Sequence, residues 1–474
     1  MPDNSDRDPD GDRPEDEFRD LLREFLSGNS DLDPGRLASA AGLPNDPALV
    51  AQLMSRLQDA LQNSGDGINW GLALEQAKAV AERDRRPSLP AERSAIEQAF
   101  HVAARWLDEA TVIAELTATP RLISRTEWVT ATMPIWTQLA EPVATSIADA
   151  LTRVLHEQSP DDLEDMIAGA SRLMRNVGGT LFAMQLGQVV GQLSTEVVSG
   201  GDVGIPLFGV EEDASVQAGS VQAGSAQAGT AQAGAVQAAI LPQNIAAFGA
   251  GLDIDEEQVR LYLAVRELAH ARLFRHARWL RLQLLTSIGE IARGITINTG
   301  RLEELAESFD PSNPESLQQA VSAGELLAPK NESQIAALAR LETTLALIEG
   351  WVDVVTAQAT TRLPKSAAIA ETVRRRRASG GPAESAFSTL VGLELRPRRL
   401  REAAALWQQI TDAVGAERRD ALWSHPDLVP DTEDIDDPAA LIARLTNPMP
   451  EPDDVDRAIE DLLSDERGED RPTG

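Results

Sequence analysis

Apolar residues recur at three- and four-residue spacing along most of this chain, which is the pattern of amphipathic helices. The runs with this spacing are residues 17–26, 46–62, 88–200, 254–293 and 331–359. Asp253 and Asn331 precede the last two runs, and both residue types cap helix N-termini. Runs that alternate apolar and polar residues, as strands do, are scarce. The pattern therefore predicts a mainly α fold.

A five-residue repeat interrupts this pattern between Val216 and Ala238. Its four full units (VQAGS, VQAGS, AQAGT and AQAGA) each contain a glycine and have no charge and no aromatic residue. The alternatives are a small solenoid or binding arm and a flexible insertion. So small a unit cannot bury a core in four copies, which favours the insertion. The predicted organisation is a disordered acidic N-terminus (1–16), an N-terminal helical segment (17–87), a first helical part (88–212), the insertion (213–239), a second helical part (240–425) and an acidic tail (426–474).

Two glycines lie four residues apart in the run LFAMQLGQVVGQLSTEVV, at Gly187 and Gly191. Small residues at this spacing allow two helices to approach closely. The same spacing is found in membrane dimers, but Gln185, Gln188 and Gln192 lie beside these glycines. We therefore expect a close helix contact within a water-soluble fold.

Charge and composition narrow the classes of function. The net charge is −32, which argues against a partner rich in phosphate, so neither nucleic acid nor a membrane surface is expected. The absence of cysteine excludes a thiolate metal site and a thiol nucleophile. The N-terminus has no basic start and no apolar segment, and no stretch is long and apolar enough to span a bilayer. These features predict a cytoplasmic protein.

The strongest chemical signal is the pentapeptide R-E-L-A-H, from Arg266 to His270. In the zinc-helix motif H-E-x-x-H, the two histidines lie four residues apart on one helix face and bind zinc, and the glutamate takes a proton from zinc-bound water. Glu267 and His270 match the glutamate and the second histidine. Arg266 stands where the first histidine would be, and a guanidinium has no lone pair to offer a metal.

Several longer phrases resemble an actinobacterial group within the type 2 zincin-like metallopeptidase family. They are LPQNIAAFGAGLDIDEEQVRLYLAVRELAHARLFRHARWLR, LALIEGWVDVV and ETVRRRRASGGPAESAFSTLVGLELRPRRLREAAALW. The resemblance covers roughly residues 90–425 and is interrupted by the repeat. It implies a multi-helix zincin-like fold and zinc-dependent peptide hydrolysis. The family's third zinc ligand comes from a Glu-Gly pair, which the resemblance carries onto Glu349 and Gly350.

Two functions follow from these residues. One is a zinc-dependent metalloprotease, with Glu267 as base and His270 and Glu349 as zinc ligands, acting on a peptide or protein. The other is a metal-free pseudoenzyme that acts as a protein-interaction scaffold, in which Arg266 replaces zinc by pairing with Glu349. His276 lies about 240° around the helix from His270 and faces elsewhere. The spacing of His101, His156 and His425 does not decide whether one of them completes a metal site.

Three further features have open alternatives. Tyr262 lies one turn before Arg266 and lines a pocket at the site or packs in the core. Trp351, two residues after Glu349, lines the site or packs likewise. The arginines Arg374, Arg375, Arg376 and Arg377 form a basic island. It binds an anion or partner, or it pairs with acidic residues of this chain such as the tail. No phosphate-loop ending and no G-x-S-x-G elbow is found, so nucleotide and serine hydrolysis have no support.

Overall fold

The computed structural model describes residues 68–157, 164–205, 238–294, 329–378 and 399–447, with single positions at 300 and 388. Twelve α-helices, one 3₁₀ helix and two short strands lie in this part of the chain. The α-helices are α4 (Trp70–Ala81), α5 (Pro90–Asp108), α6 (Arg125–Glu157), α7 (Glu164–Glu196), α8 (Pro242–Gly249), α9 (Glu256–His276), α10 (Arg278–Arg293), α13 (Glu332–Ala359), α14 (Ser366–Ala378), α16 (Leu400–Ala421), α17 (Thr432–Asp436) and α18 (Pro438–Thr446). The remaining elements are β1 (Arg121–Leu122), β2 (Ala239–Ile240) and η3 (Pro426–Leu428).

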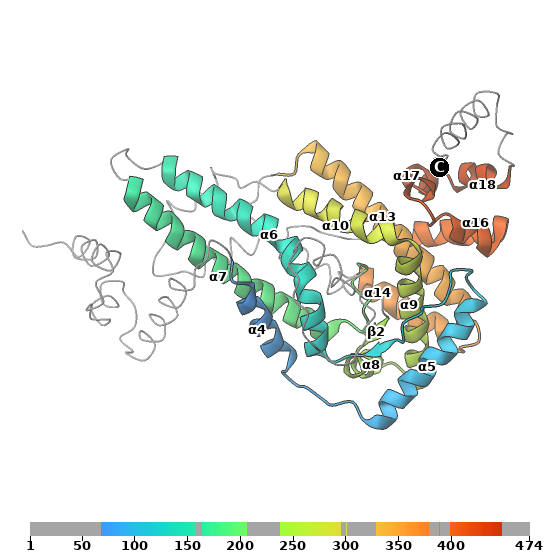
Figure 1. The fold of residues 1–474 in the computed structure, drawn as a ribbon. Coiled ribbons are helices and arrows are strands. Elements are labelled where there is room, and N and C mark those ends of the chain that lie inside the picture. Colours follow the sequence, from blue (N-terminus) through green and yellow to red (C-terminus); the bar gives the residue numbers. More distant parts are fainter. Residues whose placement is uncertain are drawn as a thin grey trace, which may run out of the picture.

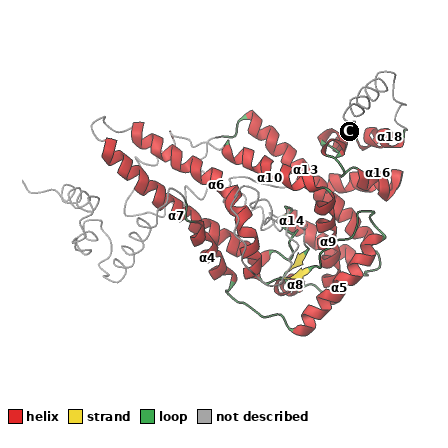
Figure 2. Cartoon of the chain, viewed as in Figure 1, coloured by secondary structure: helices red, strands yellow, loops and turns green. Residues whose placement is uncertain are grey.

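The helices form two groups, and α10 connects them through its contact with α6. The long helices α6 and α7 extend side by side away from the rest of the fold, and α4 packs along α7 (Figure 1). On the other side, α5 packs along α9, and α13 contacts α9, α10 and α16. Figure 2 shows that the strands are a minor part of this arrangement. The mainly α prediction is confirmed for the described residues.

The contact between α4 and α7 depends on two glycines. A Cβ atom at Gly187 would lie 2.4 Å from the carbonyl oxygen of Ala73. One at Gly191 would lie 2.6 Å from Cβ of Val80. Both distances are far below van der Waals contact, so only glycine allows this approach. The helix contact predicted from the glycine spacing is confirmed.

Replacing Gly187 by alanine is therefore expected to lower the free energy of unfolding by about 2 kcal/mol, as overpacked cores do. Chemical denaturation measures the loss. Gly289→Ala in α10 is the matched control, because a Cβ there meets nothing within 4 Å. The control should be neutral or stabilising by up to about 1 kcal/mol, since alanine is the better helix former. Equal losses in the two variants would contradict the close approach.

The helix predicted for 254–293 is interrupted, which corrects that prediction. Ala277 has φ −92° and ψ 70°, and it separates α9 from α10. The break lets α10 leave the direction of α9 and pack against α6 and α13, with Leu280 and Leu284 buried. No glycine or proline marks the break, so tertiary packing decides it. The N-cap is Asp255 and not Asp253, because the Asp255 side chain accepts the N–H of Glu257.

The predicted acidic tail from residue 426 is also corrected, because its first part is folded. Asp431 and Asp437 cap α17 and α18 through their side chains, so acids assigned to solvation instead begin helices. Ile435 and Leu441 are buried, and α18 packs against α16. Residues 448–474 lie outside the described residues. The same holds for the predicted N-terminal segments up to residue 67 and for nearly all of the repeat insertion.

A small sheet lies beside α9. β1 and β2 are parallel, with Arg121 paired to Ala239. On the other side of β2, Ser199 forms an antiparallel bridge with Ile240, and the N–H of Gly200 donates to the carbonyl of Ala239. This holds the segment 197–205, which we call the glycine loop, against the helices.

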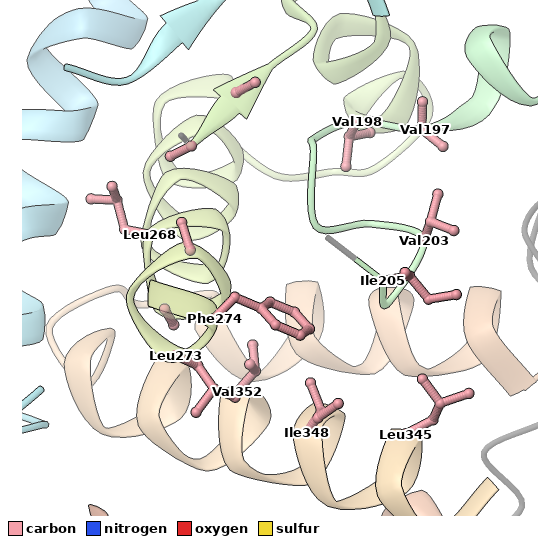
Figure 3. Close-up of a cluster of buried hydrophobic side chains, with 14 of the residues drawn as sticks. Val197, Val198, Val203, Ile205, Leu268, Leu273, Phe274, Leu345, Ile348 and Val352 are labelled. Atoms are coloured by element: carbon pink, nitrogen blue, oxygen red, sulfur yellow. The ribbon is translucent and has the colours of Figure 1, made fainter. Parts of the chain in front are cut away.

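The glycine loop, α9 and α13 share one apolar core, and Figure 3 shows α9 crossing α13 with the loop beside both. Its labelled members are Val197, Val198, Val203 and Ile205 from the loop, Leu268, Leu273 and Phe274 from α9, and Leu345, Ile348 and Val352 from α13. In the residues that the structure describes, no helix combines the length and apolar character needed to span a bilayer.

Candidate functional site

Helix α9 is buried along most of its length, and its charged residues are buried with it. Arg266, Glu267, His270 and Arg272 expose only 7%, 2%, 2% and 1% of their surface. A buried charge is costly unless it has a partner and hydrogen bonds. The neighbours of these side chains therefore determine what the R-E-L-A-H segment can do.

Glu349 of α13 lies at the centre of the site. Its Oε2 accepts a hydrogen bond from the guanidinium of Arg266. Its Oε1 lies 2.6 Å from Nη1 of Arg377 and 3.1 Å from Nε2 of His270. Burial alone would raise the pKa of Glu349, but Arg377, His270 and Arg266 hold it well below its usual range. The carboxylate is thus ionised and joins three helices, α9, α13 and α14.

His270 is enclosed. Its ring stacks on Phe274 with centroids 6.2 Å apart. On another side the glycine loop fills the space, because a Cβ at Gly201 would lie 2.9 Å from Cβ of His270. Burial lowers the pKa of His270 against the effect of Glu349, so the imidazole is neutral at pH 7. Its Nδ1 has no hydrogen-bond partner among the described residues.

Glu267 faces the small sheet and not the arginines. Its Oε2 accepts the N–H of Gly201 at 2.9 Å, and its Oε1 accepts the N–H of Ala239 at 2.8 Å. Burial raises the pKa of Glu267 to about 7, against the effect of the hydrogen bonds from Ala239, Ser199 and Gly201. The carboxyl group therefore fastens the glycine loop and β2 to α9.

Asp202 in the glycine loop is a second acid at the site, and the sequence alone did not indicate it. Its carboxylate lies 3.6 Å from Arg377 and 3.7 Å from Arg376, and it accepts the N–H of Val198. Arg377 also donates to the carbonyl oxygen of Asp202 at 3.1 Å. The nearby Gly204 has φ +80°, and a Cβ there would lie 3.4 Å from Oε1 of Glu349. In the sequence, only the neighbouring glycines indicate that this loop lies close to other backbone or side-chain atoms.

The basic island is divided between the site and the surface. Arg377 reaches Glu349 and Asp202, and Arg376 reaches Asp202. Arg374 pairs with Asp353 at 3.0 Å. Arg375 is exposed and pairs with Glu371 of its own helix. The acids that pair with the island among the described residues are Glu349, Asp202, Asp353 and Glu371, and Arg376 also donates to the carbonyl oxygen of Glu196.

The two aromatic residues do not line an open site. Tyr262 is fully buried in the core, and burial raises the pKa of its hydroxyl to about 12. Trp351 faces α16, because its Nε1 donates to Asp420 at 3.0 Å. Of the two alternatives for Trp351, lining the site or packing in the core, the observed contact favours packing. Two residues along a helix turn a side chain by about 200°, which directs Trp351 away from Glu349.

The donor set does not fit a zinc ion. Zinc sites in enzymes use three protein ligands with lone pairs. Here His270 and Glu349 are two such residues. The guanidinium of Arg266 occupies the place where the third ligand would be. Within the described ranges, no three His, Cys, Asp or Glu side chains come together as a metal site would need. His101, His276 and His425 are exposed, while the side chain of His156 lies outside the described residues.

The raised pKa of Glu267 predicts a pH dependence of stability. The folded state holds this proton more tightly than the unfolded state, whose pKa is 4.5. The stabilisation is therefore complete below pH 4.5 and is lost as the pH rises to about 7. We expect a loss of about 3 kcal/mol across this window.

The measurement is urea unfolding from pH 5 to 8 for the wild type and Glu267→Gln. The difference between the two curves isolates Glu267, because the lowered pKa of His270 acts in the opposite direction below its ordinary value of 6.5. A difference that does not change with pH would contradict the raised pKa.

Comparisons with known proteins show which family this chain belongs to. A family model described as zincin-like metallopeptidase matches residues 68–442. A solved structure from Chloroflexus aurantiacus, titled as a candidate hydrolase with a novel fold, covers 81% of this chain and 100% of its own, with a TM-score of 0.52 and 17% identity. At that identity the likeness concerns the fold. A comparison with curated proteins gives no match. Since the family model spans most of the chain, including α9 and α13, the chain belongs to the zincin-like metallopeptidase family.

Proposed function

We propose that this protein is a metal-free, non-hydrolytic member of its family and acts as a scaffold for a protein or peptide partner. The observation that carries the proposal is the state of Glu349. By the sequence resemblance this residue stands where the family has its third zinc ligand, yet it is buried and bound by Arg266 and Arg377. Two guanidinium groups thus take the position of a metal.

The first support is the number of free donors. Zinc would have to displace guanidinium groups from both oxygens of Glu349 and would then have only His270 and Glu349 as ligands. Catalytic zinc normally keeps three protein ligands. Breaking a buried ion pair without replacing it is strongly unfavourable, by about 3–5 kcal/mol. The existing ion pairs are therefore the more stable arrangement.

The second support is the environment of Glu267. A pKa near neutrality suits a general base. However, both of its oxygens accept backbone N–H groups, and only 2% of the residue is exposed. The glycine loop also lies directly against His270, so the imidazole is covered on that side. The same contacts disfavour a metal-free hydrolase that uses Glu267 and His270 as an acid–base pair.

The role left for α9 is structural. Through Arg266, Glu267 and His270 it joins α13, the glycine loop and β2 in one buried network. A fold whose reactive residues are bound to one another can still bind a partner through its helical surface. We therefore propose that the protein is a scaffold, which binds a partner but does not hydrolyse it.

Elemental analysis of the full chain, purified without a histidine tag, tests the proposal together with a mixed peptide library. We expect zinc far below one ion per chain after dialysis against zinc, and no peptide cleavage. Stoichiometric zinc that is lost in both His270→Ala and Glu349→Ala would overturn the proposal. His101→Ala, an exposed histidine on α5, is the matched control and should not change the zinc content.

A further inference from the structure

We infer that Arg377 is a second block to zinc, independent of Arg266, so that the two guanidinium groups together stand in for one divalent cation. This inference rests on the proposed metal-free function. It adds a residue from a different helix, in a part of the chain far from the R-E-L-A-H segment. It also implies that restoring the missing histidine alone does not restore a metal site.

The geometry separates the two arginines. Arg266, from α9, donates to Oε2 of Glu349, whereas Nη1 of Arg377, from α14, lies 2.6 Å from Oε1. Each oxygen of the carboxylate thus has its own guanidinium. Arg266→His would free Oε2 and leave Arg377 on Oε1, which is also the oxygen that faces His270. An ion bound between His270 and Glu349 would meet Arg377 at that point.

Arg377 is held in place by more than Glu349. It donates to the carbonyl oxygen of Asp202 at 3.1 Å and lies 3.6 Å from the Asp202 carboxylate. Its side chain is only 13% exposed. These contacts do not involve Arg266. We therefore expect the side chain of Arg377 to keep its position when Arg266 is replaced.

Charge balance leads to the same conclusion. The least exposed charges of the inner cluster are two carboxylates, Glu349 and Asp202, and two guanidinium groups, Arg266 and Arg377, while Arg376 approaches Asp202 to 3.7 Å with a side chain that is 26% exposed. The four least exposed groups therefore balance to zero. Zinc in Arg266→His would bring two positive charges beside Arg377 and leave one uncompensated in a buried place. With Arg377 also neutralised, one zinc ion balances the two carboxylates.

Position 375 provides a matched control for Arg377. Arg375 lies on the same helix and carries the same charge, but 78% of its side chain is exposed and it pairs only with Glu371 among the described contacts. Arg375→Met removes one arginine from the island without touching the cluster. A general effect of net charge on zinc binding would appear equally in this control.

The experiment compares zinc binding by four full-length, untagged proteins: wild type, Arg266→His, Arg266→His/Arg377→Met and Arg266→His/Arg375→Met. Zinc affinity is measured by competition with a chromophoric chelator, and stoichiometry by elemental analysis. Thermal melting with and without zinc reports folding and specific binding separately from any activity. If the Arg377→Met protein does not fold, Arg377→Gln replaces it.

We expect the Arg266→His/Arg377→Met protein to bind one zinc ion on the order of 100-fold more tightly than Arg266→His alone. The Arg375→Met control should match Arg266→His. Adding Glu349→Gln to the tight-binding protein should abolish its binding and the zinc-dependent rise in melting temperature. Tight stoichiometric zinc in Arg266→His alone would overturn the inference, as would weak zinc in a folded Arg377 variant. Zinc in the wild type would instead overturn the proposed function.

Discussion

Glu349→Ala is expected to lower the free energy of unfolding by about 4 kcal/mol, within the range for breaking a buried ion pair. The substitution leaves Arg266 without its carboxylate and removes the stronger of the two acidic partners of Arg377. Two buried positive charges would then remain close together, and Asp202 would be the acid that still pairs with Arg377. Urea unfolding at pH 7 measures the loss.

Glu371→Ala is the control, because it also removes a glutamate that pairs with two arginines. Glu371 lies on the surface of α14, where exposed ion pairs contribute little to stability. A Glu349→Ala loss as small as that of the control would show that the cluster does not stabilise the fold.

The free energy of unfolding of the wild type, measured as a function of pH on the acidic side, provides a second test of Glu349. Its pKa is lowered, so its contribution is complete above the ordinary value of 4.5 and is lost as the pH falls toward the folded pKa. The wild type should therefore lose more stability than Glu349→Ala on acidification below pH 4.5. Parallel curves for the two proteins in this pH range would contradict the ionised carboxylate.

The sequence predicts one half of this cluster and misses the other. The i, i+4 spacing on one helix places Arg266 and His270 on the same face, and the resemblance carries Glu349 to the same site. The structure has the guanidinium of Arg266 on Glu349, the arrangement that the metal-free alternative predicts. No local pattern links Arg377 or Asp202 to them, because Arg377 reaches Glu349 from a different helix and its contact with Asp202 spans 175 residues.

Sequence periodicity predicts some other parts of the fold correctly and others wrongly. Periodicity locates α13 and its cap at Asn331 correctly, since both depend on neighbouring residues. It fails at Ala277, where α10 turns because of what it packs against and not because of its own residues. It fails again after His425, where acidic composition suggests a tail although Asp431 and Asp437 are caps. At Ala277 a distant contact outweighs a local tendency, whereas Asp431 and Asp437 are local capping residues that acidic composition alone does not reveal.

Trp351 is part of a second buried network of charged and polar side chains, which is centred on Asp420. Oδ1 of Asp420, in α16, accepts from Nε1 of Trp351 at 3.0 Å and from Nε of Arg419 at 2.7 Å. Oδ2 accepts from the hydroxyl of Thr111 at 2.6 Å and from the N–H of Val112 at 2.9 Å. Arg419 is fully buried and lies over the ring of Trp351. One carboxylate thus fastens the end of α16 to α13 and to the segment after α5.

Asp420→Ala is therefore expected to cost about 5 kcal/mol, more than the loss of Glu349. It leaves the buried guanidinium of Arg419 without a countercharge, and at least three further donors lose their acceptor. Asp412→Ala, in the part of α16 before the kink at Gly415, is the control, because Asp412 is exposed and its described hydrogen bond comes only from Gln408. The control should change the free energy of unfolding by less than about 1 kcal/mol. Near-equal denaturation midpoints for the two variants would mean that α16 is held by its apolar contacts alone, through Leu406, Trp407 and Ile410.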